Sequence, residues 1–541
     1  MNCARTCLFI LLFSVSASAQ KIAGPLTINL GIQDGYILYN PTNYKEAYLI
    51  DGCGRLINKW TSQYAAAHTM YLRPNGTLLR TRQLTNPVLD AGGGAGGGIE
   101  IFDWDSNLLW EYTYNNNLVR QHHDIYPMPN GNVLILAWER KTLEETLAAG
   151  RNPALIADGE MWPEHIVEVH PIVPNGGEIV WEWHVWDHLI QDYDPTKANY
   201  GVVADHPELA DFNFAVDGKK DWLHANALDY NPQLDQIMIS VHGFNELWVI
   251  DHSTTTAEAA GHTGGRQGKG GDILYRWGNP MAYRKGTSAD TKIFLQHHTH
   301  WIAQGLPQAG KIMIFNNGPA RFYSSVEIIE PPVNSNGAYS LQANGRYAPE
   351  NASRTYTANP PESFFSRNMS SAQMMPNGNL FIGSATQGLA TEVTPADQII
   401  WKYKSPVTTV GIVGRTDPTT NPSYTPRPVF RTIKYPSNYA AFQGRLLTPQ
   451  EPVEGAPWAD CGLITGLEDE PQNTLAYPNP ADDRLTVTAP GTFHALLRDT
   501  QGKRVFEGKG RDQLVISTTA LPPGLYLLTV GQKTEKVVVR H

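Results

Sequence analysis

A repeated pair of strand-like segments runs through most of this sequence and constrains its fold more than any other feature. Each copy has a strand that carries an acidic residue, then a turn, then a strand that ends on aromatic residues. The copies lie at 47–60, 99–112, 166–183, 247–277, 325–329 (a weaker copy) and 391–403. A short unit repeated in series cannot bury its apolar face alone, so neighbouring copies must stack.

A second unit separates these copies, a hairpin with a Pro-Asn-Gly turn, as at Pro74–Gly76, Pro129–Gly131 and Pro376–Gly378. Asn-Gly between alternating apolar residues is a strong hairpin signal. Two hairpins per copy make a four-stranded sheet, and six such sheets in series predict an all-β, six-bladed β-propeller. Closure of a propeller requires strands from both chain ends to complete one blade. The insertions at 141–165 and 184–220 are expected to be loops on one face.

Length, composition and charge agree with a large β protein. The 541 residues exceed one ordinary core, and the 48 Gly and 38 Pro suit many short strands joined by tight turns. The net charge of −10, with no run of Lys or Arg, argues against nucleic acid or an anionic membrane as a partner. No stretch after the N-terminus approaches the ~20 apolar residues that a membrane span requires.

The N-terminus has the pattern of a secretory signal peptide over residues 1–19. Arg5 precedes the apolar run Leu8–Phe13, and small residues follow up to Ala19, where we expect cleavage. A secreted or cell-surface protein is therefore expected.

Cleavage there leaves two of the four cysteines, Cys53 and Cys461. In an oxidising compartment such a pair favours one disulfide, and two unpaired buried thiols are the alternative. Cys53 lies in the first copy and Cys461 just past the last one, so this bond would lock the closure of the propeller.

The character of the sequence changes after Thr465, which divides a propeller at 20–465 from a small β-sandwich domain at 466–541. The segment Ala476–Arg484, the stretch Pro523–Tyr526 and the basic tail resemble the C-terminal sorting domain of the type IX secretion system. The resemblance implies the type IX secretion machinery as a partner and export across the outer membrane. A carbohydrate-binding sandwich is the alternative.

Several of the 17 histidines occupy one place in the repeat, the start of the Pro-Asn-Gly hairpin. They are His68, His123, His224 and His298, with the segment 371–375 at this place in a fifth copy. Equivalent positions in propeller blades surround one axis, so these side chains are expected to converge at one mouth of the channel. The register selects His298 over His297 and His123 over His122.

Asn226 and His300 each come two residues after one of these histidines. Strand periodicity puts residues two apart on the same face, so both pairs are expected to point into the channel.

The chemistry of such a channel stays open from these residues alone. Imidazole is a common ligand of Zn, Cu or Fe, so metal binding is one possibility. A neutral imidazole can also attack a sulfuryl or phosphoryl centre while neighbouring donors hold its oxygens. A non-catalytic binding channel is a third possibility.

Five stretches, at 181–188, 221–230, 296–302, 370–379 and 429–436, resemble arylsulfotransferases, and the resemblance runs from about residue 45 to 450. It implies a six-bladed propeller that transfers a sulfuryl group from a phenolic sulfate ester to a phenol. The nucleotide sulfate donor is not used, and neither a metal nor an organic cofactor is expected. Transfer would be ping-pong through a sulfohistidine, with an aryl sulfate hydrolase or a non-catalytic ligand- or metal-binding propeller as the alternatives.

The same resemblance assigns roles to particular residues. His298 matches the histidine that becomes sulfated, with His297 as its adjacent rival. His224 and Asn226 match a pair that contacts the sulfuryl group, and His123 matches a further channel histidine.

The sequence departs from the family where an Arg is expected eighteen residues after His224, since His242 stands there. Arg is always charged and binds oxyanions with a fixed fork, whereas His is charged only part of the time near neutral pH. Arg321 is the candidate to supply the missing charge. Since only about 25 residues lie between the signal peptide and the first copy, we expect the family's N-terminal β domain to be absent or much reduced, which leaves a monomer or a dimer open.

Overall fold

The computed structural model describes residues 23–90, 93–94, 96–156, 158–214, 219–414, 425–455, 476–500, 502–530 and 533–540. The chain divides into two compact units, Met1–Ile464 and Thr465–His541, and each is described by itself. The signal-peptide segment 1–19, Cys461 and residues 466–475 lie outside the described residues. Within these ranges no helix has the length and apolar character needed to cross a membrane.

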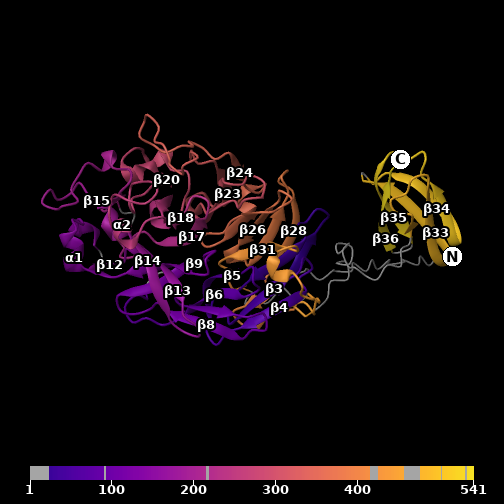
Figure 1. Ribbon diagram of the computed structural model, residues 1–541, viewed down its shortest axis with the longest axis horizontal. Coiled ribbons are helices and arrows are strands. Elements are labelled where there is room, and N and C mark those ends of the chain that lie inside the picture. The colour runs from indigo at the N-terminus through magenta and orange to yellow at the C-terminus, as the bar shows by residue number, and fades with distance from the viewer. Residues whose placement is uncertain are drawn as a thin grey trace, which may run out of the picture. The chain divides into compact units, whose positions relative to one another are not determined.

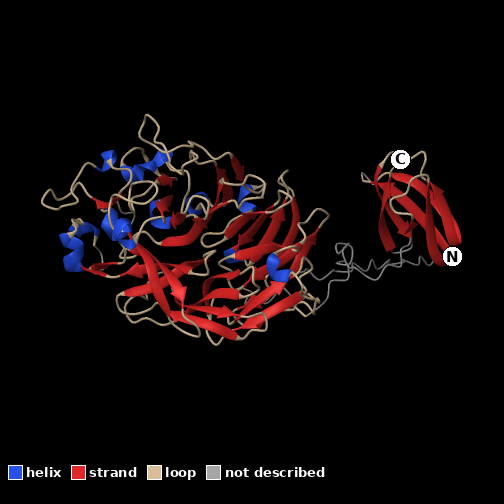
Figure 2. Ribbon diagram, in the orientation of Figure 1, coloured by secondary structure: helices blue, strands red, loops and turns tan. Residues whose placement is uncertain are grey.

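The larger unit consists mainly of small antiparallel sheets, drawn red in Figure 2. Two of them are β31 (Thr432–Pro436), β2 (Gly35–Tyr39), β3 (Glu46–Ile50), β4 (Leu56–Thr61); and β5 (Ala66–Leu72), β6 (Leu78–Gln83), β7 (Gly97–Phe102), β8 (Leu108–Thr113). The next two are β9 (Val119–Pro127), β10 (Val133–Glu139), β13 (Glu164–Pro171), β14 (Gly177–His184); and β17 (Ala225–Asn231), β18 (Gln236–Val241), β19 (Glu246–Asp251), β20 (Tyr275–Trp277). The last two are β21 (His297–Trp301), β22 (Ile312–Asn316), β23 (Ser325–Ile329), β24 (Arg354–Tyr356); and β25 (Ser371–Met374), β26 (Leu380–Ser384), β27 (Leu389–Val393), β28 (Ile399–Lys404), β1 (Gly24–Ile28).

Short elements fill the connections between these sheets. The helices and minor strands are β11 (Lys141–Thr142), α1 (Leu143–Ala148), β12 (Glu160–Met161), β15 (Leu189–Ile190), β16 (Ala210–Asp211), α2 (Thr256–Ala259), β29 (Val407–Thr408) and β30 (Gly411–Ile412). The 3-10 turns are η1 (Pro153–Leu155), η2 (Val185–His188), η3 (Val203–Asp205), η4 (His242–Phe244), η5 (Pro280–Tyr283), η6 (Ser288–Asp290), η7 (Pro319–Arg321), η8 (Pro361–Ser363), η9 (Ala385–Gln387) and η10 (Ala440–Phe442). The all-β prediction for this unit is confirmed.

The lead strands, by which we mean β31, β5, β9, β17, β21 and β25, gather around a common centre. Contacts between lead strands join β5 to β9, β9 to β17, β17 to β21, β21 to β25 and β25 to β31. The Tyr435 hydroxyl of β31 accepts a hydrogen bond from the Leu72 amide of β5 at 2.9 Å, which completes the circle. Residues at the start of every lead strand can therefore meet in one place.

The turn chemistry read from the sequence is confirmed. The Pro-Asn-Gly turns join β5 to β6, β9 to β10 and β25 to β26, and Gly76, Gly131 and Gly378 have φ of 84°, 93° and 85°. Only glycine adopts this left-handed conformation without cost. In each copy of the repeat, the strand with the acidic residue forms the third strand of its sheet and the aromatic-ended strand forms the fourth. The copy at 325–329 is weak because its partner, β24, follows only after the long loop 330–353.

Both ends of the larger unit complete the circle, as a closed structure requires. The late strand β31 pairs with the early strand β2, and Figure 1 shows the orange and indigo ribbons side by side. At the neighbouring sheet, β1 pairs with β28. Cys53 is buried in the turn between β3 and β4. Since Cys461 lies outside the described residues, their disulfide stays a prediction.

Tryptophans in five of the six fourth strands tie their sheet to the next one. Each donates its indole N–H to an oxygen in the loop between the third and fourth strands of the following sheet. The pairs are Trp60 to Asp103 O (2.8 Å), Trp110 to Gly176 O (2.8 Å), Trp181 to Thr254 Oγ1 (3.2 Å), Trp277 to Pro349 O (2.7 Å) and Trp401 to Gly52 O (2.7 Å). The last pair lies at the closure, so the same contact that joins successive sheets also joins the two chain ends.

The smaller unit differs from the predicted sandwich of two sheets. Its strands are β32 (Ala476–Tyr477), β33 (Arg484–Asp499), β34 (Arg504–Ser517), β35 (Gly524–Val530) and β36 (Lys533–Val539), and they form one sheet. The long β33 pairs with β32 near its start and with β35 near its end, and its pairing with β34 shifts register between Ala489 and Thr492. A bridge from Ala481 to Val539 brings the sheet close to a closed barrel.

Candidate functional site

Three histidines at matching positions of their lead strands share an unusual backbone conformation. His123, His224 and His298 have φ of 47°, 46° and 48°. A residue other than glycine rarely adopts a positive φ, and such strain concentrates at functional sites. The strand pairing is irregular at each of these positions. The matched conformation supports the register that selected His123 and His298 over their neighbours.

The side chains of five histidines lie close together at the centre of the circle. These residues, which we call the histidine cluster, are His68, His123, His224, His242 and His297. Their successive ring centroids are 5.5 Å (68–123), 4.7 Å (123–224), 4.9 Å (224–242) and 5.3 Å (242–297) apart. The Phe430 ring completes the cluster, 4.8 Å from His68 and 6.1 Å from His297.

His298 and His300 form a separate pair beside this cluster. Their imidazoles stack with centroids 4.3 Å apart, so the expectation that they share one face agrees with the geometry. The Ala372 amide donates to His298 Nδ1 at 3.3 Å. Among the contacts of the described residues, none is a hydrogen bond to His298 Nε2. Because Nδ1 accepts this hydrogen bond, the neutral ring carries its proton on Nε2.

His297 differs from His298 in that both of its ring nitrogens are used by the protein. Nδ1 donates to Asn317 Oδ1 at 2.8 Å, and Nε2 accepts from the Met369 amide at 3.1 Å. Each of the two imidazoles therefore accepts a backbone N–H in this structure. They differ in that the other nitrogen of His297 donates to Asn317, whereas no hydrogen bond of His298 Nε2 is found among the described residues.

His224 carries a carboxylate partner. Its Nδ1 lies 2.5 Å from Asp221 Oδ2, which keeps the proton on Nδ1, so the lone pair of the neutral ring is on Nε2. A histidine oriented in this way by a carboxylate is the usual form of a general base. Asp221 stands three residues before His224 and was not singled out from the sequence.

His123 is held from two sides. Its Nδ1 lies 2.8 Å from Nδ1 of His122, and His122 stacks on Trp138 with centroids 4.1 Å apart. The backbone at Gly94 covers the His123 ring so closely that a Cβ there would overlap it, and its φ of 87° also requires glycine. The glycine-rich segment therefore closes over this histidine.

Burial keeps these imidazoles neutral. It lowers the pKa of His68 and His297 to about 3 and that of His300 to about 4. Burial also lowers the pKa of His122, His123, His242 and His298 well below the usual value, and the charge of Arg431 adds to the effect at His298. At neutral pH each of them can attack an electrophile or donate one hydrogen bond.

Two of the residues selected from the sequence are held by contacts within the protein. Asn226 is fully buried and its amide donates to the carbonyl of Gln296, next to His297, at 2.8 Å, while its Oδ1 has no hydrogen-bond partner among the described residues. A register shift between Ala225 and Ala227 breaks the strand period of two at this residue. Arg321, in η7, donates to Tyr323 O, Asn316 O and Ser325 Oγ, which are all local partners.

The structure brings two other cations to the site. Arg431 is buried and pairs with Asp124 at 2.7 Å, and its charge lowers the pKa of His298, His297 and His300 after the larger effect of burial. Lys219 lies near enough to His242 for its charge to lower the pKa of that imidazole. The spacing of residues in the sequence did not indicate that Arg431 belongs to the site. Arg431 reaches the centre only because β31 closes the circle of lead strands.

A buried carboxyl lies near Arg431. Asp229 accepts a hydrogen bond from the Trp301 amide at 2.7 Å, and burial raises its pKa to about 7. Asp229 thus changes its charge within the physiological range.

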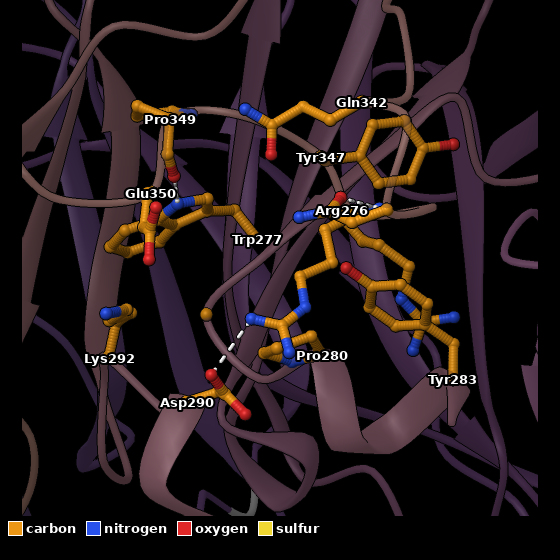
Figure 3. Close-up of a pocket in the computed structure, with 13 residues that line it drawn as sticks. Arg276, Trp277, Pro280, Tyr283, Asp290, Lys292, Gln342, Tyr347, Pro349 and Glu350 are labelled. Atoms are coloured by element: carbon orange, nitrogen blue, oxygen red, sulfur yellow. Dashed lines mark hydrogen bonds and ion pairs between the residues drawn. The ribbon is translucent and has the colours of Figure 1, made fainter. Parts of the chain in front are cut away.

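A separate hollow lies away from the histidine cluster, between η5, η6 and the loop that carries Arg346 (Figure 3). Its volume is about 40 Å³, and Asp290 in its wall pairs with Arg346 at 2.9 Å. It is too small for an aryl group, so the histidine cluster remains the candidate site.

Comparisons with known families give two matches. The family described as Arylsulfotransferase (ASST) matches residues 18–424, and the Secretion system C-terminal sorting domain matches residues 475–540. The latter is a type IX sorting domain, so the protein is exported to the cell surface or secreted. No curated protein matches the chain.

Solved structures resemble the chain only distantly. A protein of unknown function from Bacteroides caccae is 10% identical, with 74% of this chain and 98% of that chain covered and a TM-score of 0.38. Virginiamycin B lyase from Staphylococcus aureus is 9% identical, with 70% and 87% covered and a TM-score of 0.30. A protein from Lactobacillus plantarum is 9% identical, with 90% and 99% covered and a TM-score of 0.34.

Proposed function

The chain belongs to the arylsulfotransferase family, and on that premise we propose that its six sheets are the blades of a propeller that transfers a sulfuryl group from an aryl sulfate to a phenol. The observation that carries the proposal is the shared left-handed conformation of His123, His224 and His298 in three lead strands. Strain repeated at three matched positions has no use in packing, which supports a shared functional role for the three imidazoles.

In the first half-reaction, the lone pair of His298 Nε2 attacks the sulfur of the aryl sulfate. The N–S bond forms as the S–O bond to the aryl group breaks, and the phenolate leaves with the electron pair. Attack through Nε2 requires the proton on Nδ1, so the 3.3 Å contact from the Ala372 amide is given up when the donor binds. The low pKa of His298 keeps its attacking form neutral.

Neighbouring donors hold the sulfuryl oxygens as charge builds. His123 and His242 are neutral and each can donate one N–H. Lys219, beside His242, is proposed to supply the positive charge that an Arg at position 242 would provide. Preorganised donors of this kind lower the barrier because they need no rearrangement during the reaction.

In the second half-reaction a phenol replaces the departed phenolate. His224 Nε2 takes the phenol proton, since Asp221 holds the other proton on Nδ1. The phenolate oxygen attacks sulfur, the N–S bond breaks, and neutral His298 is restored. His224 then returns its proton to solvent. This double displacement requires ping-pong kinetics.

The covalent intermediate is the direct test. Brief mixing with 4-nitrophenyl sulfate, without a phenol acceptor, is expected to add one SO₃ (about 80 Da) to the intact protein. The matched variants are His298→Ala, expected to abolish the gain in mass, and His297→Ala, expected to retain it. A gain that survives in His298→Ala and disappears in His297→Ala would reverse the assignment. Release of free sulfate at the rate of nitrophenol, with no gain in mass, would favour a hydrolase.

A further inference from the structure

A group of two histidines and one aspartate lies outside the histidine cluster, in the insertions that follow β14 and β19. His188 ends η2, whereas His262 and Asp272 belong to the loop between α2 and β20. Their ligand atoms all lie within 4.8 Å of one another. Among the described residues this is the set of His, Cys, Asp and Glu side chains that meets such a spacing.

The hydrogen bonds of His188 leave one nitrogen in need of a positive partner. Its Nε2 donates to the Ala259 carbonyl at 2.8 Å, because a carbonyl oxygen can only accept. In the neutral imidazole, Nδ1 then carries a lone pair, yet Nδ1 lies 2.8 Å from Asp272 Oδ1. Two acceptors cannot face each other at this distance without a second proton or a cation between them.

The same aspartate oxygen meets a second imidazole. His262 Nδ1 also lies 2.8 Å from Asp272 Oδ1. A ligating histidine commonly donates its other N–H to a backbone carbonyl, which fixes the ring and exposes the ligating lone pair. His188 has this arrangement with Ala259.

We infer that His188 Nδ1, His262 Nδ1 and an Asp272 oxygen bind a zinc ion. Two imidazoles and one carboxylate are a donor set that zinc accepts, in tetrahedral geometry with an open fourth position. Zinc bonds of about 2.1 Å place neighbouring donors roughly 3.4 Å apart, so the carboxylate needs to withdraw by only about half an ångström.

The surroundings of this site indicate how an ion enters it and which segments the ion would join. His188 is fully buried, whereas the His262 side chain is 60% exposed and lines a cavity of about 370 Å³. The open position faces this cavity, through which ions and water enter. The bound ion joins η2 to the loop at 260–272, two irregular segments far apart in the sequence.

The test measures zinc content and stability of the full chain, expressed without a polyhistidine tag. Wild type is expected to retain about one zinc per chain after dialysis, and added zinc is expected to raise its Tm. His262→Ala is expected to weaken binding at least tenfold and to remove the rise in Tm. Because His262 is exposed, this substitution leaves the fold intact.

The matched control is His206→Ala, since His206 lines the same cavity but pairs with Glu208 at 2.9 Å. This variant is expected to bind zinc like wild type. Failure of wild type to bind zinc at micromolar concentration would overturn the inference. So would zinc that is retained in His262→Ala, or lost equally in both variants, because the ion would then lie elsewhere.

Discussion

At the scale of single residues, the register of the repeat selected histidines that share one backbone conformation. His123, His224 and His298 occupy equivalent positions in the sequence, and their backbones share one conformation. The direction of Asn226 could not be predicted, because an irregularity in strand pairing leaves no mark in the sequence. Phe430 and Arg431 could not be assigned either, since both approach the cluster only through a contact across most of the chain length.

Gly94 gives a prediction at this scale. In Gly94→Ala the new methyl group overlaps the His123 ring, so the ring or the backbone must move. We expect at least a tenfold loss of kcat/KM with 4-nitrophenyl sulfate, measured in initial-rate assays.

The control for Gly94→Ala is Gly131→Ala. Gly131 has a similar φ of 93°, but no atom lies within 4 Å of a Cβ built there. Both variants incur the strain of a left-handed alanine, about 1 kcal/mol, and only Gly94→Ala disturbs the site. Equal activities in the two variants would show that the glycine segment does not position His123.

At the scale of elements, strands and turns were more predictable than their partners. Asn-Gly favours the backbone conformation of a tight turn, so hairpins such as β5–β6 can be predicted from local sequence. The partners of the long β33 cannot, and for that reason one curled sheet was mistaken for a sandwich. Local sequence does not record which strand pairs with each half of β33.

The tryptophan contacts between sheets give the second prediction. Trp401→Phe removes the hydrogen bond to Gly52 O at the closure and leaves a carbonyl without its donor. We expect the free energy of unfolding to fall by about 1–3 kcal/mol, measured by urea denaturation. Trp110→Phe makes the same change between two successive sheets and should cost a similar amount. A cost confined to Trp110→Phe would mean that the indole does not hold the closure.

At the scale of the whole molecule, the division into two units and the all-β character follow from composition and repeats. The lowered pKa values of the histidines could not be predicted from the sequence alone. They result from burial between neighbouring sheets, and that burial exists only once the circle of sheets is assembled.

From these lowered pKa values we predict that the free energy of unfolding decreases in mild acid. The histidine pKa is about 6.5 in an unfolded chain, but about 3 for His68 and His297 and about 4 for His300 in the folded protein. Between these values the unfolded state binds more protons, so the free energy of unfolding decreases as pH falls below about 6.5. Urea midpoints measured from pH 7 to pH 5 should decrease steadily.

Other groups work in the opposite direction. Although burial opposes it, hydrogen bonds to Asp235 and Glu168 raise the pKa of His252 to about 9, so its contribution is complete below pH 6.5 and is lost as pH rises through 9. Against the effect of burial, Glu139 also raises the pKa of His184, and burial raises that of Asp229 to about 7. The buried imidazoles outnumber these three groups, so stability is still expected to fall in acid. His68→Gln should flatten the slope of stability against pH by up to about 1.4 kcal/mol per pH unit. An unchanged slope would contradict the low pKa of His68.

The pairing of β31 with β2 has a consequence for how the protein matures. During synthesis the first sheet lacks its lead strand until residue 436 has emerged, and Phe430 and Arg431 arrive with that strand. A nascent or prematurely ended chain therefore holds most of the histidines but not the residues that enclose them. We therefore expect activity to arise only when this last strand docks, and a fragment that ends before it to be inactive.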